Sequence, residues 1–138
     1  MALSLAVSNL NKSPNAIELY KGQSKDLEIA IVSETVESGV SSTQAQNLTG
    51  ATVYFTVRSR PGEPSAMITK SSADPSQISI PSPATAGKAI LYIEPSDTAH
   101  LNAGMYVFDV WVVLNTGKTY PVIEVSELKI LEPVTVIS

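Results

Sequence analysis

Residues 106–113, YVFDVWVV, decide the fold class because they form a long apolar run with one charged side chain, Asp109. Successive side chains of a β-strand point to opposite faces of the sheet. One face would hold Tyr106, Phe108, Val110 and Val112, and the other would hold Val107, Asp109, Trp111 and Val113. A strand that covers a single core has only one apolar face. The run therefore predicts a central strand whose second face also needs cover.

Shorter runs of alternating apolar and polar residues flank this stretch, and Gly, Pro, Ser and Asn separate them. Period-two alternation between turn residues is typical of strands, so the chain is predicted to be all-β. The expected strands are residues 16–20, 26–33, 52–58, 66–70, 77–80, 88–94, 105–114 and 119–131, the last with a bend. Seven or eight strands at this spacing predict an antiparallel β-sandwich.

A chain of 138 residues is about one domain long. We expect an N-terminal arm over residues 1–15, a sandwich over 16–131 and a C-terminal arm over 132–138. The polar stretch 34–50 is expected to form a long loop or a ragged sheet edge. Three of the remaining alternating runs each supply one face of the core. These faces contain Leu27, Val53 and Leu91, each with the residues two positions before or after it.

Composition excludes several function classes. The net charge is −4 and the nine Lys and Arg residues are scattered, so no nucleic-acid partner is expected. The absence of cysteine excludes disulfides and thiolate chemistry. No run approaches the ~20 apolar residues of a membrane span, and no basic leader precedes the first apolar patch. We expect a soluble, unsecreted protein made in a cytoplasm, with no membrane partner.

No constellation of residues predicts catalysis. Glu94 and Asp97 flank Pro95, but calcium needs six or more oxygen ligands, so no metal site is expected. His100 is the single histidine, and no neighbouring residue completes a Ser-His-Asp arrangement. We expect neither an enzyme nor a cofactor.

The segments 97–99 and 104–108 resemble the helical corner and the following strand of immunoglobulin-like domains. In that corner a tyrosine hydroxyl returns to the backbone. The resemblance implies that Asp97, Gly104 and Tyr106 form a structural corner. It also implies that Phe108 takes the position where antibody domains place a cysteine, in a sandwich that lacks the disulfide.

A wider pattern covers about residues 17–131 and consists of segments 18–23, 48–55, 87–93, 97–101, 104–112 and 117–121. In this order the segments resemble the N-terminal domain of tailed-phage baseplate upper proteins and similar small virion proteins. Those β-sandwiches attach a component to the virion and carry no catalytic residues. The resemblance implies a non-enzymatic structural protein of a bacteriophage, made in the cytoplasm of a bacterial host.

In such a particle the protein would dock in multiple copies on capsid or tail proteins. This chain ends at Ser138, without room for a receptor-binding module after the sandwich. That departure from the baseplate proteins favours head decoration, as a cement protein, over a tail or baseplate adaptor.

The second face of the central strand is the candidate interface. Burying a tryptophan is worth roughly 4–6 kcal/mol, so Trp111 should be covered. Either the chain itself covers Trp111, through residues 34–50 or residues 3–7, or a partner covers it, which is a second copy or a different protein. The third alternative is that the face of Trp111 is misassigned. The candidate interface residues are Trp111, Asp109, Val107, Val113, Tyr54, Arg58, Tyr120 and Val122 on the sheet and Leu3, Leu5, Val7, Val134 and Val136 on the arms.

The alternating termini favour a homo-oligomer in which the arms dock on neighbouring subunits. A rival function is a carbohydrate-binding or adhesive module. In that case Trp111, Tyr54 and Tyr120 would stack on sugar rings beside Asp109 and Arg58.

Overall fold

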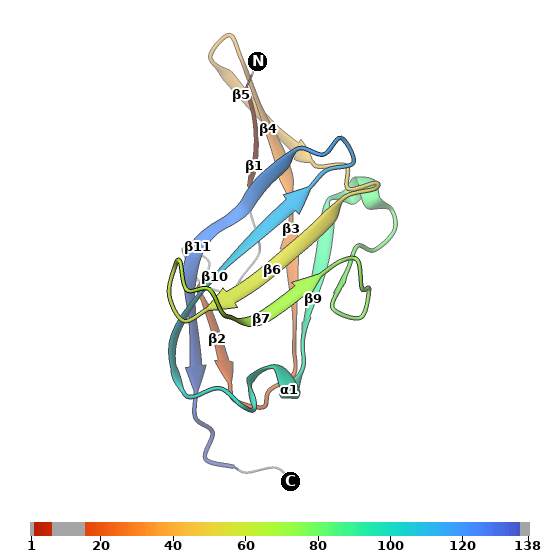
Figure 1. Ribbon diagram of the computed structural model, residues 1–138. Coiled ribbons are helices and arrows are strands. Elements are labelled where there is room, and N and C mark those ends of the chain that lie inside the picture. The colour runs from red at the N-terminus through yellow and green to blue at the C-terminus, as the bar shows by residue number, and fades with distance from the viewer. Residues whose placement is uncertain (1, 7–15, 136–138) are drawn as a thin grey trace.

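A computed structural model describes residues 2–6 and 16–135, and for 2–6, 34–37 and 41–43 it describes the backbone only. The described chain is all-β apart from two short helical turns (Figure 1). The strands are β1 (Ala2–Ala6), β2 (Ile17–Tyr20), β3 (Lys25–Ala30), β4 (Val32–Glu37), β5 (Val40–Ala45), β6 (Thr52–Arg58), β7 (Ala66–Ser71), β8 (Ile78–Ser79), β9 (Lys88–Ile93), β10 (Gly104–Val113) and β11 (Thr119–Leu131). The turns are the 3-10 helix Ala84–Ala86 and α1 (Pro95–Thr98).

Two sheets form the sandwich. The five-stranded sheet has the order β2-β11-β10-β6-β7 and lies across the sheet β3-β9-β8 (Figure 1). All pairings are antiparallel except that of β11 with β2. This order matches the two sheets of a variable-type immunoglobulin sandwich, so the predicted all-β, immunoglobulin-like class is confirmed. The strands outnumber the predicted seven or eight, because β1, β4 and β5 form a third sheet.

The core lies between the facing sheets and is built from the predicted alternation. Phe55 and Phe108 are almost completely buried, with ring centroids 5.6 Å apart and planes tilted by 42°. The other predicted inward residues of 26–33, 52–58 and 88–94 are also buried, namely Leu27, Ile29, Ile31, Val53, Val57, Ala89, Leu91 and Ile93. Hydrophobic burial on both inner faces therefore fixes which side of each strand points inward.

The expectation for 34–50 was a long loop or a ragged sheet edge, and the loop is wrong for residues 34–45, which form a hairpin at a sheet edge. Strands β4 and β5 pair along their whole length and are joined by a two-residue turn in which Ser38 and Gly39 have φ of +52° and +79°. Positive φ at both central residues is the geometry of a type I′ hairpin. The hairpin projects beyond the sandwich (Figure 1), where no core requires apolar residues at alternate positions. The sequence therefore lacked the apolar alternation that predicts a strand.

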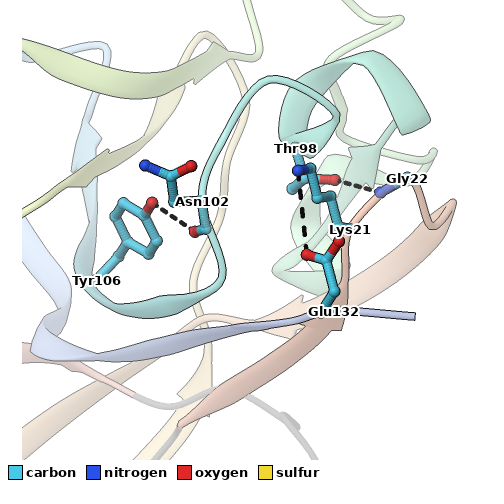
Figure 2. A network of polar contacts seen from close by, with 6 residues as sticks. All are labelled: Lys21, Gly22, Thr98, Asn102, Tyr106 and Glu132. Carbon is cyan, nitrogen blue, oxygen red and sulfur yellow. Dashed lines mark hydrogen bonds and ion pairs between the residues drawn. The ribbon is translucent and has the colours of Figure 1, made fainter. Parts of the chain in front are cut away.

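The corner before β10 joins distant parts of the chain (Figure 2). The hydroxyl of Tyr106 donates to the carbonyl of Asn102 at 2.7 Å, the contact that a tyrosine corner requires. The backbone N–H of Gly22 donates to the fully buried hydroxyl of Thr98 at 2.9 Å. Together these contacts fix the turn after β2 to the loop that feeds β10.

Asp97 has a structural role in the same corner. Its Oδ2 accepts the backbone N–H of Glu94 at 2.8 Å and lies 2.7 Å from the ammonium of Lys70. Lys70 is 8% exposed and shares the inward face of β7 with Ile68. The ion pair therefore joins the edge strand β7 to α1 across the end of the core.

Replacing Tyr106 by Phe removes the hydroxyl but keeps the ring. We expect the free energy of unfolding to fall by about 0.5–1.5 kcal/mol, the net contribution of one hydrogen bond. Tyr54→Phe is the matched control, because no described residue bonds to the Tyr54 hydroxyl, and it should change stability by less than about 0.3 kcal/mol. Urea unfolding measures both, and equal effects would contradict the role of the corner.

Candidate binding face of the five-stranded sheet

The face of the five-stranded sheet that points away from the core, here called the outer face, carries rows of residues in register. Tyr54 of β6 lies opposite Trp111 of β10, and Trp111 lies opposite Pro121 of β11. Three ring side chains thus form one row, here called the aromatic row. The next two rows along β10 are centred on Asp109 and Val107.

The aromatic row is open to solvent. Trp111 is 38% exposed and Tyr54 is 43% exposed, while Pro121 is also exposed. The indole Nε1 donates to Asp109 Oδ2 at 3.0 Å. Because its one polar group is already bonded, Trp111 offers only ring surface to a partner. Val107, Val113 and Asp109 are half-buried on the same face, and their interface role stays a prediction.

The placement of Tyr120 and Val122 on this face was wrong. Tyr120 lies opposite Val112 and packs against the core, and Val122 is buried. The pairing of β10 with β11 shifts twice, between Phe108 and Val110 and again between Val110 and Trp111. An extra residue in one strand reverses the inward and outward positions beyond it. Over the whole strand the two shifts cancel, so Tyr120 and Val122 point inward like Leu128 and Ile130. Alternation counted from the exposed Glu124, across the shift between Val110 and Trp111, assigns them to the opposite face.

A small cavity lies next to the aromatic row. Its volume is about 160 Å³, and Thr56, Arg58, Val107, Asp109 and Val125 line it together with the loop residues Pro61 and Gly62. Nη1 of Arg58 donates to the carbonyls of Glu63 and Pro64 at 2.8 and 3.1 Å. These bonds hold the β6–β7 loop beside the outer face, so the cavity has a cation at one wall and a carboxylate at another.

Where they are described, the segments expected to provide cover do not lie over the aromatic row. Strands β1 and β5 both pair with β4, in the sheet that continues from β3. Leu3 and Leu5 belong to β1, while Val7 and Val136 lie outside the described residues. Val134 is fully exposed beyond the end of β11. An interface role of the arms stays a prediction, and within the described chain the outer face is uncovered.

The remaining polar groups do not gather on this face. No cluster of three or more His, Asp or Glu side chains suited to a metal occurs in residues 16–135 whose side chains are described. His100 is exposed near the corner. Hydrogen bonds from the Ser76 side chain, then its backbone, lower the pKa of Asp74 in an exposed turn.

None of the described helices is both long and apolar enough to cross a bilayer.

Comparison with known proteins shows a distant likeness of fold. No family model matches the chain, and no curated protein matches it. Among solved structures it is similar to murine CRIg, with 14% sequence identity and a TM-score of 0.37, over 96% of this chain and 99% of that chain. A likeness this distant carries no argument about binding, and the fold class rests on the strand order and the corner.

The register shifts predict different effects for Val122 and Val125, which lie three residues apart on β11. Val122→Asp places an unpaired carboxylate in the core and should lower the free energy of unfolding by about 3 kcal/mol or more. Val125 is 56% exposed, so Val125→Asp should cost about 1 kcal/mol or less. Thermal and urea unfolding of both variants measure the difference. A larger loss of stability in Val125→Asp than in Val122→Asp would show that Val122 lies on the outer face after all.

Proposed function

We propose that this chain is a non-enzymatic structural protein of a tailed-phage particle. Several copies dock on capsid or tail proteins, each through its outer face. The observation that carries the proposal is the open row formed by Tyr54, Trp111 and Pro121, which no described segment covers. The virion context is supported by the sequence resemblance to baseplate upper proteins. The head surface is the first candidate location, as a decoration or cement protein, and the tail is the second.

The composition of the outer face suits a protein partner. Trp and Tyr are the residues that most often dominate binding energy at protein interfaces, together with Arg. Here Trp111 lies at the centre of three paired strands, with Tyr54 and Pro121 on either side. Covering the exposed parts of the row would remove apolar surface from water without leaving the indole nitrogen unpaired.

The charges beside the row can set the orientation of the partner. Asp109 is half-buried and bonded to the indole, and Arg58 holds the β6–β7 loop. Charged groups at the rim of an interface contribute to specificity and association rate more than to affinity. Each contact can therefore be weak, because a particle that presents many equivalent sites retains its bound proteins through avidity.

Co-sedimentation with empty capsids and with isolated tails of the encoding phage tests the proposal. The wild-type chain should sediment with one of the two, and Trp111→Ala should weaken binding by at least about tenfold. Val40→Ala is the matched control, since Val40 is 68% exposed on the β4–β5 hairpin and lies outside the five-stranded sheet. It should bind normally. Binding to neither particle, or equal binding of Trp111→Ala, would overturn the proposal.

A carbohydrate-binding module is the second candidate function. It is favoured by the cavity of about 160 Å³ beside the aromatic row, with Arg58 and Asp109 in its lining. Sugars bind by stacking on aromatic rings and by hydrogen bonds to charged and polar side chains. Glycan-array binding by a monomeric protein, lost in both Trp111→Ala and Arg58→Ala, would support this function in place of particle docking.

A further inference from the structure

The second surface of interest is the free edge of β5. The sheet β1-β4-β5 has two edges, and β1 lies beside β11 as well as pairing with β4. Strand β5 pairs with β4 on one side and has no described strand on the other. It belongs to the hairpin that projects beyond the sandwich (Figure 1), so its edge can be reached by another molecule.

The sequence of β5 lacks the devices that protect edge strands. Exposed edges are normally short, charged, interrupted by proline, or carry an inward-pointing charge. Among the other edges, β8 has two residues and β2 has four, one of them Glu18. Strand β3 carries Lys25, Asp26 and Glu28, and β7 carries the inward Lys70. The six residues VSSTQA of β5 contain neither a charge nor a proline. Strand β5 is therefore the long edge of the described sheets that is open to pairing.

The register of the hairpin shows which backbone groups are free. The N–H of Gln46 donates to the carbonyl of Ile31 at 3.0 Å, so the backbone groups of residue 46 point at the strand beside it. Along an antiparallel strand this direction alternates with each residue. The N–H and C=O groups of Ser41, Thr43 and Ala45 therefore point away from β4, toward the free edge.

We propose that β5 pairs with β5 of a second copy of this chain in an antiparallel dimer. A two-fold axis at Thr43 places Thr43 opposite its own equivalent, and Ser41 opposite Ala45 of the second copy. All three outward residues then exchange hydrogen bonds, about six in total, in one continuous sheet. Identical strands satisfy this pairing because an isologous contact is self-complementary, and the uncharged edge brings no repulsion.

The dimer is independent of the proposed function, because β5 lies outside the outer face. Pairing through β5 leaves Tyr54 and Trp111 of both copies free. If these copies dock on a particle, the dimer presents two outer faces and gains avidity. If they bind nothing, the dimer is unaffected.

Sedimentation velocity over a range of protein concentrations tests the pairing. The wild-type mass should rise from the 14.6 kDa of one chain toward twice that value. Thr43→Pro removes an outward N–H while leaving the ladder with β4 intact, so this variant should stay monomeric. Thr43→Val keeps the N–H and should dimerise like the wild type. Trp111→Ala should also dimerise, which separates this surface from the outer face.

Disulfide trapping gives a second readout that does not depend on the proline variant folding. The chain has no cysteine, so a single introduced one reports without background. A mixture of Ser42→Cys and Gln44→Cys chains should form an intermolecular disulfide on mild oxidation. With the axis at Thr43, residues 42 and 44 of the two copies face each other in a non-hydrogen-bonded pair, whose side chains lie within bridging range. Ser38→Cys, at the hairpin tip, should not. A wild type that stays monomeric, or equal trapping of the mixture and of Ser38→Cys, would overturn the proposal.

Discussion

The position of β10 between β6 and β11 is the constraint on which the rest of the structure depends. Its inner face contributes Phe108, Val110 and Val112 to the core, and these side chains are almost completely buried. Its outer face carries Val107, Asp109 and Trp111, and no second core lies on that side within the described residues. One strand thus supplies both the stability of the sandwich and an apolar surface that a partner can cover.

Part of this arrangement could be predicted from the sequence. Alternation identified the core faces because burial repeats every second residue, and the residues around Tyr106 identified the corner. The sides of Tyr120 and Val122 are misassigned by alternation counted from Glu124, since the shift between Val110 and Trp111 depends on pairing with β10. The ion pair between Lys70 and Asp97 also left no signal, because a lone lysine in an edge strand is usually solvated.

The two proposed surfaces have different physical origins. The outer face offers aromatic side chains, whose contact with a partner depends on shape and removal of water. The edge of β5 offers backbone groups, whose contact depends on register and on the absence of charge. The hairpin projects from the sandwich while the aromatic row lies across the five-stranded sheet, so the two contacts can form at once (Figure 1). Both suit a protein that assembles in many copies.

The exposure of the indole is the most direct test of the central claim. Trp111 is the single tryptophan, so its fluorescence reports the aromatic row without interference. In dilute protein without a partner, acrylamide should quench the fluorescence of Trp111 in the native chain to a large fraction of the quenching seen in the urea-unfolded chain. The Thr43→Pro variant should show the same quenching as the native wild type. An indole shielded in the dilute native chain would show that the outer face is already covered and would contradict this account.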